Sequence, residues 1–221
     1  MNEQFEITRK FWGSEITRGN LIWPDEFVIR FVKRNYRNKE NTVILDFGCG
    51  AGRNAVALAS EGYEIIAMDY TEEAIAIVNE KKGTLPIKAI KNKGLEIPVA
   101  PESIDAVIAD GSLFYNNIED TIIILKNIRK ALKTGGKFWA NWRSINDSLY
   151  GKGELLDNGL YKLEAGSKRE GCNYLFCNPE TLQDIYCQAG FEIESIDRHS
   201  YTENNGKNLC EWHFVVAVNN G

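Results

Sequence analysis

Apolar and polar positions follow two alternating periods along most of this chain. From residue 42 onward, short runs rich in Val and Ile are followed by longer stretches in which apolar residues recur at helical spacing. This order is typical of βαβ units, which build a parallel sheet. The strands predicted in this way are residues 42–47, 63–69, 85–90, 104–110 and 136–142. Because these runs are apolar on both faces, we expect helices to cover both sides of the sheet.

Helix boundaries are indicated by caps and terminators. Thr71 can cap a helix whose first turn is acidic. The stretch IEDTIIILKNIRKALKTGG predicts a helix that its glycine pair ends, and residues 179–190 predict another. Two apolar runs, 191–199 and 208–218, then flank a polar turn and predict a hairpin. The expected fold is α/β: a Rossmann-like, mostly parallel seven-stranded sheet with helices on both faces and a C-terminal antiparallel hairpin.

Two segments lie outside the alternating pattern. A domain takes roughly 150 residues, so a chain of 221 residues predicts one domain with a surplus. We expect a single domain over residues 1–221, with residues 1–40 as an N-terminal helical lid and residues 143–177 as an insertion over the sheet edge. The first segment holds an aromatic cluster of Phe5, Phe11, Trp12, Trp23 and Phe27. We expect Trp23 and Phe27 to pack on the sheet. Trp12 can offer an aromatic face to a ligand or can instead pack on the sheet.

Composition and charge narrow the class of protein. Hydrophobic residues make up 43% and charged residues 26%, as in soluble globular proteins. The net charge of −5 argues against nucleic acid as a partner. The longest aliphatic run, IIIL, is far shorter than the roughly 20 apolar residues of a membrane span, and the amino end shows no apolar signal region. We therefore expect a cytoplasmic protein without membrane contact. Five scattered cysteines and two histidines without a CxxC pair predict free thiols and no metal site.

The most specific motif is LDFGCGAG, which follows the first strand. It places Asp46 before three glycines at alternate positions, Gly48, Gly50 and Gly52. Glycines there allow a tight turn and a close approach of the backbone to a ligand, while the next helix offers unpaired N–H groups. The dinucleotide fingerprint GxGxxG is not met. Asp69 ends the second strand, near the spacing at which a carboxylate accepts hydrogen bonds from a ribose.

These residues resemble the motif of the class I methyltransferases that use S-adenosylmethionine, in which an acidic residue precedes GxGxG. The resemblance covers residues 40–142 and includes SIDAVIADGSLFY and LKNIRKALKTGGKFWA. It implies that the cofactor is held by the following residues: Asp46, Gly48, Gly50, Gly52, Asp69, Tyr70, Gly94, Leu95 and Asp110. A weaker resemblance to the tellurite-resistance methyltransferases lies in the glycine loop and the Arg-Asn pair after it. The chain departs from the family at Lys93, where relatives carry an acid that contacts adenine; Gly94 and Leu95 can still offer main-chain contacts.

Methyl transfer needs chiefly an acceptor held about 3 Å from the sulfonium methyl. A general base is required only when the acceptor is protonated. Asp110 and Tyr115 are our candidates for the catalytic site, although Asp110 can instead cap a turn and Tyr115 can instead pack. His213 is expected to be an ordinary sheet residue and His199 a surface residue.

Four residues are our candidates for substrate contact. Trp142 and Arg143 lie where the fifth strand ends, Tyr115 lies in the loop after the fourth strand, and Trp12 belongs to the amino-terminal aromatic cluster. The Arg143 guanidinium suits a carboxylate or phosphate, and its alternative is an ion pair with an acidic residue.

Several functions remain open at this level. The leading hypothesis is methyl transfer to a small polar metabolite, such as an amine, a hydroxyl or a phosphate- or carboxylate-bearing compound. The alternatives are a methyltransferase of RNA or protein, a nicotinamide-dependent oxidoreductase, and a binding protein that keeps the cofactor fold. The sequence leaves the oligomeric state open, a homodimer included.

Overall fold

The computed structural model describes residues 22–164 and 170–221. The predicted ligand contact Trp12 and the first half of the predicted lid lie outside the described residues. The helical elements are α2 (Glu26–Asn35), α3 (Arg53–Ser60), α4 (Glu72–Lys81), the 3₁₀ turn η1 (Leu113–Tyr115), α5 (Ile118–Ala131) and α6 (Pro179–Gln188). The strands are β1 (Val43–Phe47), β2 (Glu64–Asp69), β3 (Ile87–Lys91), β4 (Ile104–Ala109), β5 (Leu132–Ser144), β6 (Gly153–Leu155), β7 (Tyr161–Leu163), β8 (Asn173–Tyr174), β9 (Phe176–Cys177), β10 (Glu192–Glu203) and β11 (Asn208–Val218).

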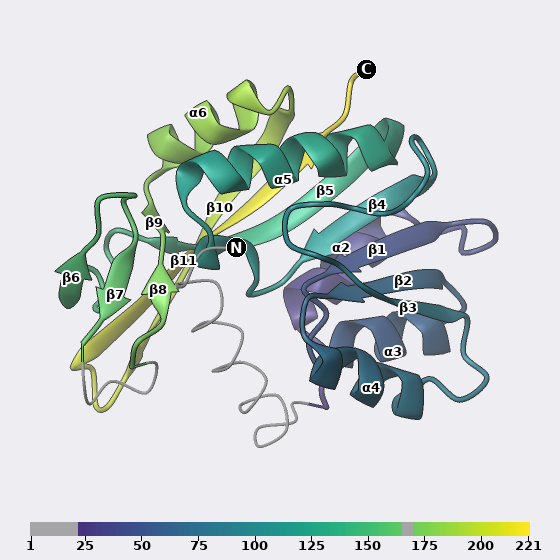
Figure 1. Cartoon of the computed structure of the whole chain (residues 1–221), viewed down its shortest axis with the longest axis horizontal. Coiled ribbons are helices and arrows are strands. Elements are labelled where there is room, and N and C mark those ends of the chain that lie inside the picture. Colours follow the sequence, from purple (N-terminus) through teal and green to yellow (C-terminus); the bar gives the residue numbers. More distant parts are fainter. Residues whose placement is uncertain (1–21, 165–169) are drawn as a thin grey trace.

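A mixed sheet runs through the described structure (Figure 1). Its strand order is β10, β11, β5, β4, β1, β2, β3, and the short β9 pairs with the end of β5. The strands from β5 to β3 are parallel, whereas β11 is antiparallel to both β5 and β10. This arrangement confirms the predicted fold and adds β9 to it. The chain order reverses between β1 and β4, and sheets of this kind bind ligands at the carboxyl ends of the strands beside such a reversal.

Helices cover both faces of the sheet (Figure 1). On one face α5 and α6 pack in a cluster that includes Leu125 and Tyr186. On the other face α2, α3 and α4 contribute Val28, Leu58 and Val78 to a second cluster. All five side chains are fully buried, and burial of one such aliphatic side chain stabilises the fold by about 1.5–3 kcal/mol. The two clusters explain why the strands are apolar on both sides.

The helices begin at the capping residues that their sequences supply. The Thr71 hydroxyl accepts a hydrogen bond from the Ala74 N–H at 3.3 Å, which confirms the predicted start of α4. Pro179 occupies the first turn of α6, and the side chain of Asn178 accepts from the Thr181 N–H at 2.8 Å. Each cap satisfies an N–H group that has no partner inside its helix.

The junction between α5 and β5 differs from the prediction. The helix ends at Ala131 and the chain enters β5 at Leu132, so the glycine pair lies inside the strand. Gly135 has a φ of 79°, and the β4 pairing shifts register here. A glycine pair therefore marks an irregular strand start here, because a positive φ disrupts strand pairing as readily as it ends a helix.

Residues after β5 form more regular structure than their composition predicts. Strands β6, β7 and β8 make a small antiparallel sheet, which lies beside the far end of the β10–β11 hairpin in Figure 1. The Leu175 N–H donates to the Phe114 carbonyl at 2.7 Å. The small sheet is thus joined to the loop that follows β4, at the carboxyl edge of the large sheet.

The two described aromatic residues of the amino-terminal cluster differ in their packing. Phe27 packs on Phe214, with ring centroids 4.4 Å apart, as predicted. Trp23 is 79% exposed, so its predicted packing on the sheet is wrong. The reason is its position: Trp23 precedes Asp25, the cap of α2, and so lies outside the apolar face of that helix. No helix within residues 22–164 or 170–221 is long and apolar enough to cross a membrane.

Candidate active site

The glycine loop between β1 and α3 is a tight turn in which all three predicted glycines have positive φ. The values are 73° at Gly48, 51° at Gly50 and 79° at Gly52. The N–H groups of Gly48 and Cys49 both donate to the Met68 carbonyl, at 2.8 and 2.9 Å. The loop is thereby fixed to the end of β2. Residues with a side chain rarely adopt this left-handed backbone conformation, which explains why glycine occupies these three alternate positions.

The three glycines face different surroundings. A Cβ atom on Gly48 would collide with the Ser112 side chain, and one on Gly52 would lie 2.8 Å from Val78 Cγ2. A Cβ atom on Gly50 would meet nothing within 4 Å. Gly48 and Gly52 are therefore required by packing, whereas Gly50 faces open space that a ligand can fill.

Asp69 is buried at the carboxyl end of β2 and is held by its neighbours. Its Oδ2 accepts from the Gly50 N–H at 3.0 Å, and its Oδ1 accepts from the Thr71 N–H and hydroxyl, both at 2.8 Å. Burial raises the pKa of this carboxyl, while the hydrogen bonds from Thr71 and Gly50 oppose the rise. The side chain is thus oriented before any ligand binds; its contact with a ribose remains a prediction.

Asp46, in β1, is the most perturbed carboxyl of the glycine loop region. It is 2% exposed, and its Oδ2 has no hydrogen-bond partner among the described residues. Burial and the nearby Asp110 raise the pKa of Asp46 to about 8, against a smaller lowering by Arg53. An unpaired buried oxygen of this kind costs about 1–3 kcal/mol. A cationic group beside Asp46 would remove that cost.

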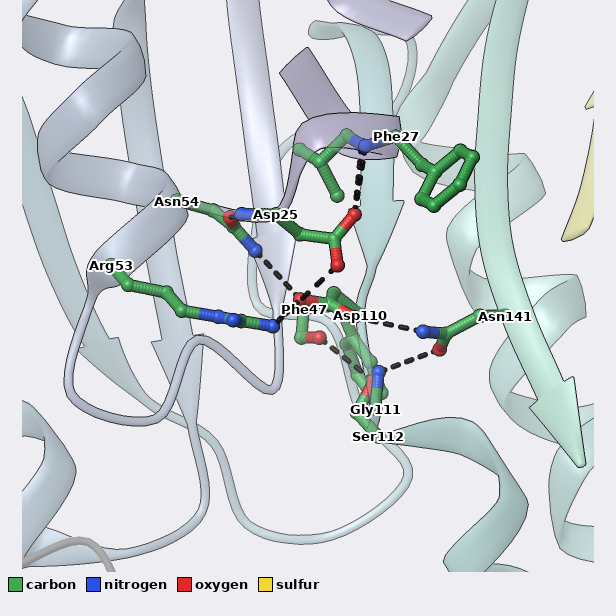
Figure 2. A network of polar contacts seen from close by, with 10 residues as sticks. Asp25, Phe27, Phe47, Arg53, Asn54, Asp110, Gly111, Ser112 and Asn141 are labelled. Atoms are coloured by element: carbon green, nitrogen blue, oxygen red, sulfur yellow. Dashed lines mark hydrogen bonds and ion pairs between the residues drawn. The ribbon is translucent and has the colours of Figure 1, made fainter. Parts of the chain in front are cut away.

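Asp110, predicted to be catalytic and to contact the cofactor, is the centre of a polar network (Figure 2). Its Oδ2 accepts from Arg53 Nη2 at 2.5 Å and from Asn54 Nδ2 at 3.0 Å, and its Oδ1 accepts from Asn141 Nδ2 at 2.8 Å. The Asn54 Oδ1 in turn accepts from the Asp25 N–H at 2.9 Å. The network joins the start of α2, the start of α3, the end of β4 and β5. Both Asp110 oxygens are engaged, which argues against its use as a base.

The loop after β4 is fixed against the glycine loop. The Gly111 N–H donates to Asn141 Oδ1 at 2.7 Å, and the Ser112 hydroxyl donates to the Phe47 carbonyl at 3.0 Å (Figure 2). The next residues form η1, where the partly buried Tyr115 has its ring centroid 5.2 Å from that of Tyr174. Tyr115 therefore lies on the segment that borders the glycine loop, between that loop and the small sheet.

The end of β5 separates the two predicted substrate contacts. Trp142 is fully buried and its Nε1 donates to the Tyr186 hydroxyl at 3.2 Å, so the prediction that it contacts substrate is corrected. Successive side chains of a strand point to opposite faces, and Trp142 points into the cluster of α5 and α6. Arg143 points the other way and pairs with Asp147 at 2.6 Å, as its alternative interpretation expected. The same alternation, applied to the sequence alone, could have shown that Trp142 does not belong to the substrate site.

The remaining residues predicted to hold the cofactor follow β2 and β3. Tyr70 is partly buried directly after Asp69, and Gly94 and Leu95 are partly buried after β3. The Leu95 carbonyl already accepts from Asn127 Nδ2 at 3.0 Å, and the Gly94 carbonyl accepts from Asn92 Nδ2 at 2.9 Å.

Both histidines are placed in the sheet. His213 is buried in β11 as predicted, and burial lowers its pKa. His199 stacks on Phe214, with ring centroids 5.7 Å apart.

Several residues of the region were missed by sequence reasoning. They are Asn54, Asn92, Asn141, Tyr174 and Trp212. Asn54 begins a predicted helix, Asn141 lies near the end of a predicted strand and Asn92 follows another, positions that could have marked them as polar contacts. The two aromatic residues come from segments far apart in the chain, and only the fold brings them together.

Comparison with known proteins agrees with this geometry. Residues 44–136 match the family model described as a methyltransferase domain. TehB of Haemophilus influenzae, a probable S-adenosyl-L-methionine-dependent methyltransferase, is 32% identical over 95 residues, which are 42% of this chain and 33% of that protein. The tRNA N(3)-cytidine methyltransferase METTL6 of Mus musculus is 27% identical over 195 residues, which are 80% of this chain and 65% of that protein. The chain thus spans about a third of the TehB length.

Solved structures share the fold. The crystal structure of TehB from Haemophilus influenzae has a TM-score of 0.65 at 19% identity, covering 92% of this chain and 65% of that one. A 1,6-didemethyltoxoflavin-N1-methyltransferase from Burkholderia thailandensis, solved with 1,6-didemethyltoxoflavin and S-adenosylhomocysteine, has a TM-score of 0.68 at 19% identity, covering 98% and 88%. Residues 44–136 therefore resemble a methyltransferase domain, and the chain has the fold of the solved methyltransferases named above, with a narrower likeness to TehB.

Proposed function

We propose that this protein transfers a methyl group from S-adenosylmethionine to a small polar acceptor. The observation that carries the proposal is the pairing of the glycine loop with Asp69 through the Gly50 N–H, beside the open space at Gly50. This places a ligand-accessible backbone next to an oriented carboxylate at the point where the strand order reverses. The match of residues 44–136 to a methyltransferase domain supports the same assignment.

The cofactor fits the residues present. The glycine loop would line its methionine part, Asp69 would accept from the ribose hydroxyls, and the unpaired Asp46 oxygen suits its ammonium group. Tyr70 and the main chain of Gly94 would border the adenine. When bound, the cofactor supplies an electrophilic methyl group, so the chain itself need only orient the acceptor and exclude water.

Asp110 serves, in this proposal, as a positioning residue and not as the general base. Three donors from Arg53, Asn54 and Asn141 hold its carboxylate and occupy both of its oxygens. Through Asn141 and Gly111 it fixes the loop that leads to Tyr115. Tyr115 is the better candidate for contact with the acceptor, because it lies three residues after the Ser112 that touches the glycine loop.

RNA is the second candidate acceptor, because the likeness to METTL6 extends over 80% of this chain. The net charge of −5 favours a small molecule instead, since RNA affinity depends on the neutralisation of many phosphates. The class of acceptor therefore needs a direct test.

Calorimetry with S-adenosylhomocysteine and with NADH tests the cofactor. Binding of the former alone supports the proposal; binding of NADH alone would overturn it. Radiolabelled methyl transfer from S-adenosylmethionine to a metabolite extract, compared with transfer to total tRNA, then tests the acceptor class. Label in the small-molecule fraction is expected, and label only in tRNA would replace the small acceptor with RNA.

A further inference from the structure

Arg143 is held in one orientation at the carboxyl end of β5. Its Nη1 donates to Asp147 Oδ2 at 2.6 Å, and its guanidinium carbon lies 3.8 Å from the centroid of the Trp212 ring. The Asp147 side chain is fully buried and also accepts from the N–H groups of Glu211 and Leu149, at 3.1 and 2.9 Å. Because its ion-pair partner and its stacking partner are both fixed, the guanidinium loses little conformational entropy when it binds a ligand.

One edge of this guanidinium has no hydrogen-bond partner among residues 22–164 and 170–221. The Arg143 Nε is buried and has no hydrogen-bond partner within the described part of the chain. Asp147 engages Nη1, which leaves Nε and Nη2 as the other edge of the planar group. These two N–H groups are parallel and match the two oxygens of a carboxylate. An unsatisfied buried donor costs about 1–3 kcal/mol, so a ligand that accepts from Nε recovers that cost.

Arg143 lies on the side of β5 that faces the predicted cofactor site. Arg143 follows Asn141 by two residues and therefore shares its face of the strand, roughly 7 Å further along. Asn141 contacts Asp110 and Gly111, and the neighbouring Ser112 packs against Gly48 of the glycine loop. An acceptor anchored at Arg143 can thus extend toward the glycine loop.

Aromatic rings border the same place. The Phe114 ring lies 5.6 Å from the Trp212 ring and 5.2 Å from the Tyr174 ring. Tyr174 also lies 5.9 Å from the Arg143 guanidinium carbon. Tyr115 and Trp212 are only partly buried. These surfaces suit an apolar or aromatic body behind a charged group.

We propose that the Nε and Nη2 edge of Arg143 binds a carboxylate of the methyl acceptor, which makes the substrate a carboxylic acid with an aromatic or apolar body. This inference rests on the proposed methyltransferase function and specifies its substrate class. A carboxylate is favoured over a phosphate ester because the buried carboxyl group of Asp147 already pairs with Arg143. A negative charge at this position repels a dianion more strongly than a monoanion.

Ligand-observed NMR titration of the protein saturated with S-adenosylhomocysteine tests the proposal. The probes are benzoate, benzamide and phenyl phosphate, which share a ring and differ in the anchoring group. We expect benzoate to bind about tenfold more tightly than benzamide, because charge-assisted hydrogen bonds contribute about 1.5–3 kcal/mol. Phenyl phosphate should bind more weakly than benzoate. Equal affinity for benzoate and benzamide, or no benzoate binding at all, overturns the inference.

Variants separate recognition from folding. Arg143→Met alone would leave Asp147 as an unpaired buried charge, so Arg143→Met/Asp147→Asn removes both charges together. In this double variant the preference for benzoate over benzamide should disappear, while benzamide affinity changes by less than about threefold. Arg30→Met, at an exposed position of α2, is the matched control and should keep the preference. A benzoate preference that survives in the double variant contradicts the inference.

Failure of the inference and failure of the proposed function give different results. The saturation with S-adenosylhomocysteine is measured first, by calorimetry. Absence of that binding defeats the proposed function, whereas cofactor binding without a preference for benzoate defeats only the role of Arg143.

Discussion

The Gly50 N–H donates to Oδ2 of Asp69 at 3.0 Å, so the glycine loop and the end of β2 form one unit. Two further hydrogen bonds to Asp69 come from the N–H and hydroxyl of Thr71, the cap of α4. The Asp69 carboxylate therefore holds the glycine loop and the start of α4 together. The same hydrogen bonds fix the orientation of the carboxylate itself. The polar groups of this unit are already oriented before a ligand binds, which reduces the entropy cost of binding.

Asp69→Ala should weaken S-adenosylhomocysteine binding by about tenfold to a hundredfold, because it removes a charged acceptor and frees the Gly50 N–H. Calorimetry measures the loss. Glu73→Gln, on the exposed side of α4, is the control and should bind normally. Unchanged affinity in Asp69→Ala would show that this carboxylate serves the fold alone.

Alanine at Gly48 should act mainly on stability, whereas alanine at Gly50 should act mainly on cofactor binding. Gly48→Ala places a methyl group against Ser112 and should lower the free energy of unfolding by more than about 2 kcal/mol, since a clash adds to the left-handed backbone cost. Gly50→Ala has open space and should lose only about 1 kcal/mol, yet its methyl group should obstruct the cofactor. Denaturant unfolding and calorimetry measure the two effects.

The Gly48 clash has its own control. Gly48→Ala/Ser112→Gly removes the side chain that the new methyl group meets, so it should recover part of the stability that Gly48→Ala loses. If the double variant were no more stable than the single one, the cost would lie in the backbone conformation and not in the contact.

Arg53→Met should destabilise the protein by about 1–3 kcal/mol, because Asp110 is largely buried and would keep only its two asparagine donors. Arg53→Met/Asp110→Asn removes the uncompensated charge and should recover part of the loss. Thermal unfolding compares the two. An Arg53→Met protein of wild-type stability would mean that the Arg53 contact with Asp110 contributes nothing net in solution.

The sequence predicted the scaffold better than the acceptor side of the site. The glycine loop, Asp69 and the Thr71 cap follow from local rules, because φ preference and capping depend on a few neighbouring residues. Trp142 was assigned to the wrong face, although the alternation along β5 could have placed it in the core. The pairing of Arg143 with Trp212 depends on the register between β5 and β11. Such contacts join distant segments, which periodicity cannot predict.

Asp46→Asn should change how stability depends on pH. The pKa of Asp46 is raised from 3.8 to about 8 in the folded protein, mainly by burial. Between these values the folded state holds a proton that the unfolded state has released, so the Asp46 contribution to stability falls as pH rises from about 4 and levels off above about 8. Relative to wild type, Asp46→Asn should therefore gain stability across this range. Denaturant unfolding at several pH values measures the difference, which should be smallest near pH 4.

The same carboxyl should link cofactor binding to proton release. A cationic ammonium beside Asp46 favours its ionised form, so binding of S-adenosylhomocysteine below about pH 8 should expel a proton and should strengthen as pH rises toward that value. Calorimetry in buffers of different ionisation enthalpy counts the protons released. Asp46→Asn has no proton to release at this position, so the part of the pH dependence of S-adenosylhomocysteine affinity that comes from Asp46 should disappear. If wild type and Asp46→Asn release equal numbers of protons, the ammonium does not bind at Asp46, and the orientation proposed for the methionine part of the cofactor must be reversed.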